Sequence, residues 1–142
     1  MLPFKIDLTD KVVVVTGGGG VLCSTFSEAL AECGAKVAVL DLRKEAADKV
    51  AEAINNKGGQ AAGFAADVLN IDSLKDVKKQ INEALGTVDI LINGAGGNHP
   101  KGTTTKEYLY KEDLEKNEDI ITFFDLDPKG VEFTFNLNFI GT

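Results

Sequence analysis

The stretch Val12-Val13-Val14-Val15-Thr16-Gly17-Gly18-Gly19-Gly20 decides how this chain folds. Four consecutive β-branched residues indicate a strand buried on both faces, as in a parallel sheet. The glycines follow where a helix must begin, and glycine readily adopts the positive φ that so tight a turn requires. Such a turn presents the free N–H groups of a helix N-terminus, which suit a phosphate. The stretch therefore predicts a nucleotide-binding turn, although a glycine run alone also fits a flexible turn without a ligand.

The residues after the glycines predict a helix and then a second strand. A single apolar stripe on a helix ending before Gly34 is expected from Leu22, Phe26, Ala29, Leu30 and Cys33. The strand at residues 36–40 closes on Asp41. An acidic residue about 20 positions beyond the glycines is placed to bind ribose hydroxyl groups. The alternative role for Asp41 is to cap a helix that begins near Lys44.

Strands and helices continue to alternate up to residue 97. The helix at 44–57 is expected to turn Ala47, Val50, Ala51 and Ile54 inward, and a small-residue strand at 60–66 closes on Asp67-Val68. Asn70 is a suitable N-cap for the third helix, and the apolar residues 88–92 form a fourth strand before Asn93-Gly94-Ala95-Gly96-Gly97. This alternation predicts an α/β fold, a Rossmann-like, doubly wound parallel sheet of order 3-2-1-4 between two helical layers, in one domain spanning 1–142.

The remaining residues are less regular. Residues 98–118 show no clear period, and the charged run 111–118 is expected to form a solvated loop that can include a short helical turn. Asp127-Pro128 is a typical helix start, with a capping residue followed by proline at the first helical position. Because the next helix is apolar on two faces, it should be buried or pack on another subunit.

The composition excludes several function classes. The chain has 142 residues and a net charge of −7, which argues against nucleic acid or an anionic membrane as partner. No apolar run is long enough to span a bilayer, the first residues lack a secretory signal, and the two cysteines have no metal-like spacing, so a cytoplasmic location is expected. With one histidine, His99, a metal site is not expected.

These landmarks together resemble the short-chain dehydrogenase/reductase family. The resemblance rests on Thr16-Gly17 with its glycine run, Asp41, Asp67-Val68, Asn93-Gly94-Ala95-Gly96 and Leu137-Asn138-Phe139-Ile140-Gly141, in that order. Within the family, residues 94–100 and 123–127 are similar to the D-mannonate oxidoreductase (fructuronate reductase) subgroup. The resemblance implies hydride transfer between a nicotinamide cofactor and a sugar acid ketone or alcohol, in a homo-oligomer (a dimer or tetramer).

Two departures from the family pattern affect this expectation. Val21 and Cys23 stand where the family has later glycines, although cysteine is small enough to let the first helix approach the first strand. The family's serine and its Tyr-x-x-x-Lys pair are not among these residues, since Glu112 follows Tyr108 by four positions and Leu114 follows Tyr110 by four. The 142 residues alone are therefore expected to be inactive, as the cofactor-binding half.

The resemblance also assigns roles to individual residues. The glycine turn would face the pyrophosphate, Asp41 the adenosine ribose, and Asp67 with Val68 the adenine. Cofactor binding is expected from Gly17, Gly19, Gly20, Val21, Leu22, Asp41, Leu42, Arg43, Asp67, Val68, Asn93, Gly94, Ala95 and Gly96. Asn138 would hold a water or main-chain group in a catalytic proton relay; the alternative is an asparagine satisfied by neighbouring backbone.

Charge decides between the two nicotinamide cofactors. Asp41 repels the 2′-phosphate of NADP and bonds the free hydroxyl of NAD, whereas Arg43 could attract that phosphate. We therefore expect NAD. Asn98, His99 and Lys101 follow the fourth strand at the edge where substrates bind, and His99 or Lys101 could meet the carboxylate of a sugar acid. Each could equally be a solvent-facing loop residue.

Three rival interpretations remain. The chain could be a nucleotide-binding module without catalysis, or a methyltransferase-like Rossmann domain, against which Asn93-Gly94-Ala95-Gly96 argues. It could also be a short-chain dehydrogenase for another sugar or alcohol. The interpretation we favour is that the 142 residues are part of a longer enzyme, whose small-molecule substrate the sequence does not specify.

Overall fold

A computed structural model describes residues 6–114 and 119–142 of the chain, so the end of the charged run at 115–118 lies outside the described residues. Contacts divide the chain into two compact units, one ending at Ala95 and the other beginning at Gly96. We call them the sheet unit and the α4 unit. The sheet unit contains β1 (Val12–Thr16), α1 (Val21–Glu32), β2 (Lys36–Asp41), α2 (Lys44–Asn56), β3 (Gln60–Ala65), α3 (Ile71–Ala84) and β4 (Ile90–Ile92).

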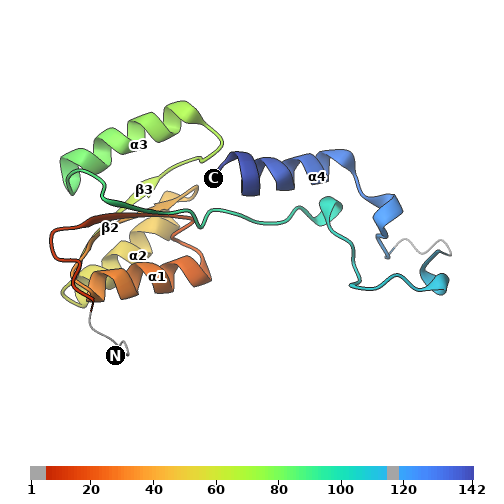
Figure 1. Ribbon diagram of the computed structural model, residues 1–142, viewed down its shortest axis with the longest axis horizontal. Coiled ribbons are helices and arrows are strands. Elements are labelled where there is room, and N and C mark those ends of the chain that lie inside the picture. Colours follow the sequence, from red (N-terminus) through yellow and green to blue (C-terminus); the bar gives the residue numbers. More distant parts are fainter. Residues whose placement is uncertain (1–5, 115–118) are drawn as a thin grey trace. The chain divides into compact units, whose positions relative to one another are not determined.

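The four strands form one parallel sheet in the order β3-β2-β1-β4, which confirms the predicted topology (Figure 1). In the register of the sheet, Val13 pairs with Val37 on β2 and with Ile90 on β4. β4 is shorter than the predicted strand at 88–92, and Leu91 at its centre is 56% exposed. In the sheet unit, α1, α2 and α3 each connect two consecutive strands, as parallel pairing requires.

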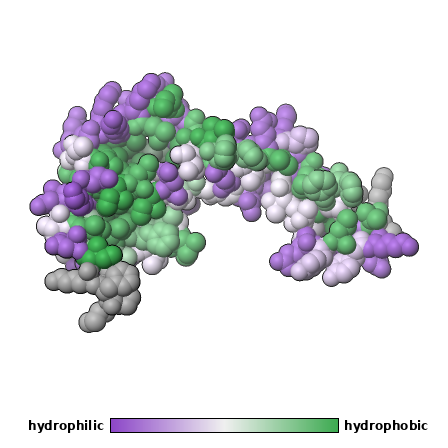
Figure 2. All heavy atoms as spheres, viewed as in Figure 1, coloured by the Kyte–Doolittle hydropathy of each residue, from purple (hydrophilic) through white to green (hydrophobic). Residues whose placement is uncertain are grey.

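Helices cover both faces of the sheet. α1 and α2 lie on one face and α3 on the other (Figure 1). α2 buries Ala47, Val50, Ala51 and Ile54, which confirms its predicted inward face, and α3 buries Val77 and Ile81. Asn70 caps α3 as predicted, with its side chain accepting hydrogen bonds from Asp72 N and Ser73 N. Hydrophilic side chains gather over the outer face of α3 (Figure 2).

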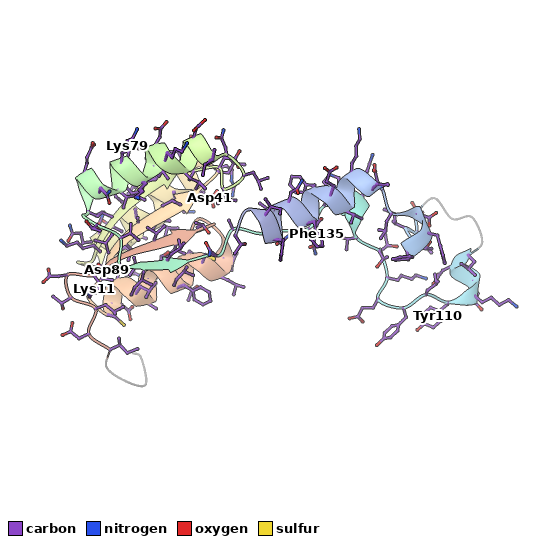
Figure 3. The ribbon with its side chains drawn as sticks, turned by 45° about the horizontal axis from the view of Figure 1, so that its top comes forward. Lys11, Asp41, Lys79, Asp89, Tyr110 and Phe135 are labelled. Atoms are coloured by element: carbon purple, nitrogen blue, oxygen red, sulfur yellow. The ribbon has the colours of Figure 1, made fainter. Side chains whose placement is uncertain are left out.

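A carboxylate fastens β4 to β1 at the amino end of the sheet. Asp89 accepts a hydrogen bond from Val12 N at 2.9 Å and pairs with Lys11 Nζ at 3.0 Å. These two bonds, first that from Val12 and then that from Lys11, hold the pKa of Asp89 below its usual range. Figure 3 shows this pair at the opposite end of the sheet from Asp41. The predicted site is therefore expected at the carboxyl end of the strands, where Asp41 lies.

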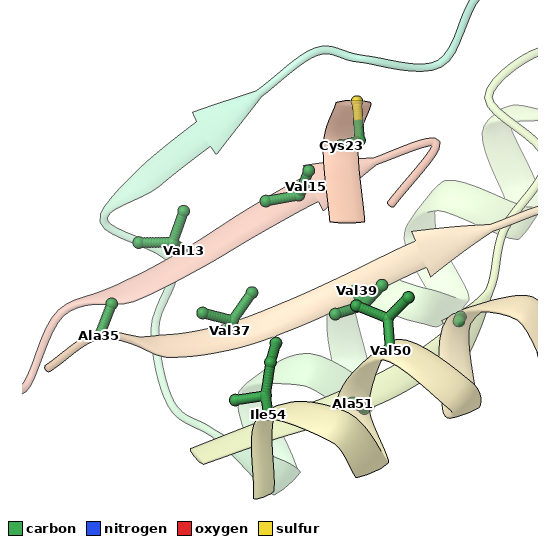
Figure 4. Close-up of a cluster of buried hydrophobic side chains, with 10 residues drawn as sticks. Val13, Val15, Cys23, Ala35, Val37, Val39, Val50, Ala51 and Ile54 are labelled. Carbon is green, nitrogen blue, oxygen red and sulfur yellow. The ribbon is translucent and has the colours of Figure 1, made fainter. Parts of the chain in front are cut away.

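The first helix corrects one prediction. Leu22 and Phe26 were expected on the inner stripe of α1, yet they are 72% and 48% exposed, and the fully inward residues are Cys23 and Ser27. Cys23 joins the core on this face, with Val15 beside it (Figure 4). Because Cys23 and Ser27 have small side chains, α1 can approach the sheet closely on this side.

The α4 unit has short helical turns and one longer helix. It contains η1 (Pro100–Gly102), η2 (Lys111–Leu114), η3 (Phe123–Asp125), α4 (Pro128–Phe135) and a π-helical turn, η4 (Asn136–Ile140). Asp127 caps α4 as predicted, by accepting a hydrogen bond from Lys129 N. The prediction of a solvated loop at 111–118 is wrong at Asp113, which is 7% exposed. Its carboxylate bonds Lys106 Nζ and Tyr110 N, and this pairing makes burial of the charge tolerable.

No helix in the ranges 6–114 and 119–142 is both long and apolar enough to cross a membrane.

Candidate functional site

The glycine turn after β1 packs so closely that side chains cannot be accommodated there. Gly17 has φ +64°, and a Cβ added to it would lie 2.8 Å from Gly94 O. A Cβ on Gly19 would lie 2.7 Å from the Ala46 side chain and 2.8 Å from Asp41 Oδ2. The glycines are therefore required both for backbone conformation and for close approach. The result is a narrow turn of bare backbone leading into α1.

The start of α1 is open to a ligand. Its N-cap, Gly20, has no side chain to satisfy the first N–H groups of the helix, and the first turn carries no acidic residue. Val21 is 88% exposed and Leu22 is 72% exposed, so the first turn faces solvent. The unsatisfied N–H groups and the positive end of the helix dipole fit an anionic group such as a diphosphate. This arrangement supports the predicted role of the turn.

Cys23 fills the place where a glycine was expected. Its Sγ lies 3.8 Å from Gly94 O, and burial raises the pKa of the thiol. A Cβ on Gly94 would collide with this sulfur atom and would lie 2.8 Å from Thr16 O. The small cysteine therefore lets α1 approach the segment after β4, whereas the sequence had predicted its approach to β1.

Asp41 joins the end of β2 to the glycine turn. Its Oδ2 accepts a hydrogen bond from Gly19 N at 3.2 Å, and its Oδ1 accepts one from Arg43 N at 3.0 Å. The guanidinium Nε of Arg43 lies 3.9 Å from Oδ1. The alternative prediction, that Asp41 caps α2, is wrong, because the N-cap is Arg43 and forms no side-chain cap. The side chain of Asp41 is 14% exposed, so its carboxylate borders the turn and still reaches the surface.

Thr16 is a residue whose role the sequence did not reveal. Its hydroxyl accepts hydrogen bonds from Gly94 N at 3.0 Å and from Ala95 N at 3.1 Å, and the residue is 6% exposed. One side chain on β1 thus fixes the backbone that follows β4. The signal was present, because a polar residue ends an otherwise apolar strand just where the glycines begin.

The other residues predicted around the adenosine lie at the same edge of the sheet unit. Asp67 follows β3, where its Oδ1 accepts a hydrogen bond from Leu69 N at 2.9 Å. Val68 is half-buried, and Leu42 is 73% exposed just after β2. The sheet unit thus brings together the glycine turn, Asp41 and the residues 93–95. Their contacts with a cofactor stay predictions.

Asn138 is held by backbone groups within the α4 unit. Its Oδ1 accepts a hydrogen bond from Gly97 N at 3.0 Å, and its Nδ2 donates to Gly97 O and to Thr134 O, each at 2.7 Å. It lies in the π-helical turn, in which Gly141 N donates to Asn136 O at 2.8 Å. A Cβ on Gly96 would lie 2.6 Å from Asn138 Oδ1. Asn138 thus fastens residues 96–97 to the helix; its proton-relay role stays a prediction.

The three predicted substrate residues follow directly along the chain. His99 accepts a hydrogen bond at Nδ1 from Lys101 N at 3.2 Å and packs edge-on against Phe133, with ring centroids 5.4 Å apart. Asn98 and Lys101 are exposed. The structure places all three on one short segment of the α4 unit.

Comparison with known proteins identifies relatives along nearly the whole chain. The family model for short chain dehydrogenases matches residues 11–141. An uncharacterized oxidoreductase of Haemophilus influenzae is 50% identical over 136 residues, which are 96% of this chain and 47% of that protein. The uncharacterized oxidoreductase UxuB of Bacillus subtilis is 44% identical over 141 residues, covering 99% of this chain and 49% of that protein. The chain thus spans about half the length of these relatives.

A solved structure shows the same fold. It is a Haemophilus influenza protein, provisionally named a D-mannonate oxidoreductase, with bound NAD. It matches this chain with a TM-score of 0.88 and 50% sequence identity, over 96% of this chain and 48% of its own.

Proposed function

The chain belongs to the short chain dehydrogenase family, and we propose that it forms the cofactor-binding half of an NAD-dependent oxidoreductase acting on sugar acids. One observation carries the proposal: the bare glycine turn and the open N-terminus of α1 lie beside the carboxylate of Asp41. A diphosphate and a ribose diol are the two groups that such neighbours can bind together.

NAD is the proposed cofactor. The N–H groups at the start of α1 would bind the diphosphate, and Asp41 would accept hydrogen bonds from the ribose hydroxyls. A 2′-phosphate would meet the Asp41 carboxylate, and the Arg43 side chain that could offset this repulsion lies 3.9 Å from that same carboxylate. The bound NAD of the similar Haemophilus influenza structure supports the choice.

Each remaining predicted residue has a place in this proposal. Asp67, Val68 and Leu42 would border the adenosine, and Asn93, Gly94, Ala95 and Gly96 would pass beneath the rest of the cofactor. Asn98, His99 and Lys101 would bind the substrate. Asn138 would position a water or main-chain group in the proton relay.

The proposed reaction reduces a ketone or oxidises the matching alcohol. When bound, the nicotinamide supplies a hydride to the carbonyl carbon, or accepts it in the reverse direction, while a proton joins or leaves the oxygen. Because neither Tyr108 nor Tyr110 has a lysine four positions later, the proton donor is proposed to lie outside these 142 residues. This chain's residues would bind the cofactor and orient the substrate.

We propose a homo-oligomer and a cytoplasmic location for the protein. Exposed aromatic residues on the helix of the α4 unit, such as Phe135 at 62% and Phe139 at 70%, support contact with another subunit. Two free cysteines, Cys23 and Cys33, suit a reducing compartment.

The test is turnover by the protein that carries this sequence. We expect D-fructuronate to be reduced with oxidation of NADH, and D-mannonate to be oxidised in the reverse direction, both followed by nicotinamide absorbance. Turnover of other ketones alone would overturn the sugar-acid substrate. Binding of NADH without turnover of any ketone or alcohol would instead favour a nucleotide-binding module.

A further inference from the structure

The segment from Gly97 to Lys101 lies along α4 and the π-helical turn η4 that continues it. The segment is antiparallel to this helix, and hydrogen bonds join the two at successive positions. Backbone or side-chain hydrogen bonds join Gly97 to Asn138, His99 N to Thr134 Oγ1 at 3.2 Å, and Lys101 O to Asp127 N at 2.9 Å. Beyond it, Gly102 packs so closely on Gly130 that a Cβ on either would clash with backbone. The segment is therefore a rigid support rather than a loose loop.

The ring of His99 is fixed on this support. Its Nδ1 accepts a hydrogen bond from Lys101 N, so in this arrangement the ring proton is on Nε2. The edge-on contact with Phe133 fixes the plane of the ring. Nε2 forms no hydrogen bond within the described residues, and the residue is only half-buried. His99 therefore presents one N–H donor in a set direction.

The neighbours of His99 offer matching chemistry. Lys101 is exposed, and its ammonium pairs with no carboxylate in the part of the chain that the structure describes. Asn98 is also exposed, and its amide makes no hydrogen bond there. A fixed donor, a positive charge and an unsatisfied amide thus lie within four residues of a rigid segment. This set suits an anionic group bearing several oxygen atoms.

We propose that His99 is a specificity-determining residue, whose Nε2–H donates a hydrogen bond to the carboxylate of the substrate while the Lys101 ammonium supplies the charge. This inference rests on the proposed function, because it assigns one end of the sugar acid to this segment. It explains why a half-buried imidazole is locked by both a backbone amide and an aromatic ring. If His99 only capped η1 through Nδ1, a change at Nε2 would not affect its role, and its substitution would not distinguish one substrate from another.

Two variants separate donation from capping. His99→Asn keeps an acceptor near the position of Nδ1 and removes the distal donor, whereas His99→Gln keeps a distal donor. Kinetics of the protein that carries this sequence are measured with NADH and either D-fructuronate or D-fructose, in which CH2OH replaces the carboxylate. Lys101→Gln removes the proposed positive charge, and Lys129→Gln, at an exposed lysine without a carboxylate partner in the described residues, is its matched control.

For His99→Asn we expect the KM for D-fructuronate to rise by about 10- to 100-fold with little change in kcat, since a hydrogen bond to a charged group is lost. His99→Gln should recover most of this loss, and Lys101→Gln should raise the KM for D-fructuronate. The kinetics with D-fructose and the kinetics of Lys129→Gln should stay unchanged. A wild-type KM in His99→Asn, or equal losses with both substrates, would overturn the inference and leave the proposed function standing. No turnover of D-fructuronate by the wild-type protein would overturn both.

Discussion

The sheet unit buries aliphatic side chains on both faces of its sheet, whereas the buried residues described in the α4 unit are Asp113, Thr122 and Gly130. Val13, Val15, Val37 and Val39 are almost fully buried in the sheet unit. In the α4 unit, hydrogen bonds hold the chain: Thr122 and Asp125 form a reciprocal capping box, and Asn138 fastens Gly97. The cofactor site therefore rests on a packed hydrophobic core, whereas the proposed substrate segment depends on individual polar contacts.

The largest effect should come from a cavity in the sheet unit. Ile54 on α2 is 2% exposed, so Ile54→Ala should lower the free energy of unfolding by about 2–5 kcal/mol. Phe124→Ala in the α4 unit removes a larger side chain that is 76% exposed and should change stability by about 0.5 kcal/mol or less. Urea denaturation of both variants measures the contrast. Equal losses would show that Phe124 is covered in the protein as it exists, and the comparison would fail.

The next effect isolates close packing from backbone strain. Gly17→Ala and Gly58→Ala both place a side chain at positive φ, +64° and +85°, but only at Gly17 does a Cβ meet other backbone atoms. Gly17→Ala should therefore cost about 1–3 kcal/mol more than Gly58→Ala, since overpacking adds to the strain. Denaturant titration gives the difference. Equal costs would mean that the segment after β4 can move away from the turn.

Acidification should affect the two units differently. The bond from Val12 N and then that from Lys11 lower the pKa of Asp89. The bond from Lys106 and then that from Tyr110 N lower the pKa of Asp113. For a lowered pKa, the stabilisation is present above the pKa of the unfolded chain and is lost as the pH falls through the folded value. We expect the Tyr110 amide to lose hydrogen-exchange protection on acidification, after correction for intrinsic rates, because little else holds it.

The Val12 amide is the internal control for this experiment. It bonds Asp89 as Tyr110 bonds Asp113, both at 2.9 Å, but it starts a strand whose side chains form the core. We expect its protection to persist under the same conditions. Loss of protection at Val12 together with Tyr110 would contradict the view that packing supports one unit and polar contacts the other.

The same contrast explains what the sequence could predict. The inward residues of α2 followed from apolar spacing, and the sheet order followed from alternation of strands and helices. α1 was predicted wrongly because hydrophobicity selects Leu22 and Phe26, whereas close approach to the sheet selects the smaller Cys23 and Ser27. Hydrophobic periodicity predicts where large apolar side chains are buried, but it does not predict close contacts made by small residues.

In the candidate site, the glycine turn and Asp41 could be found because their spacing is characteristic. The hydroxyl of Thr16 and the carboxylate of Asp113 could not be assigned partners, because these partners lie 78 residues away in one case and on an aperiodic segment in the other. The ties of Asn138 to Gly97 span 41 residues and likewise leave no local pattern.

Cofactor discrimination by the protein that carries this sequence tests the role of Asp41 most directly. Fluorescence titration should show NADH binding about tenfold or more tightly than NADPH, a difference of about 1.4 kcal/mol or more, because Asp41 repels the added phosphate. Asp41→Ser should reduce that ratio, and Asp76→Ser, which removes an exposed carboxylate on α3, should leave it unchanged. Equal affinity of the unmodified protein for both cofactors would contradict the assignment of Asp41 to the ribose.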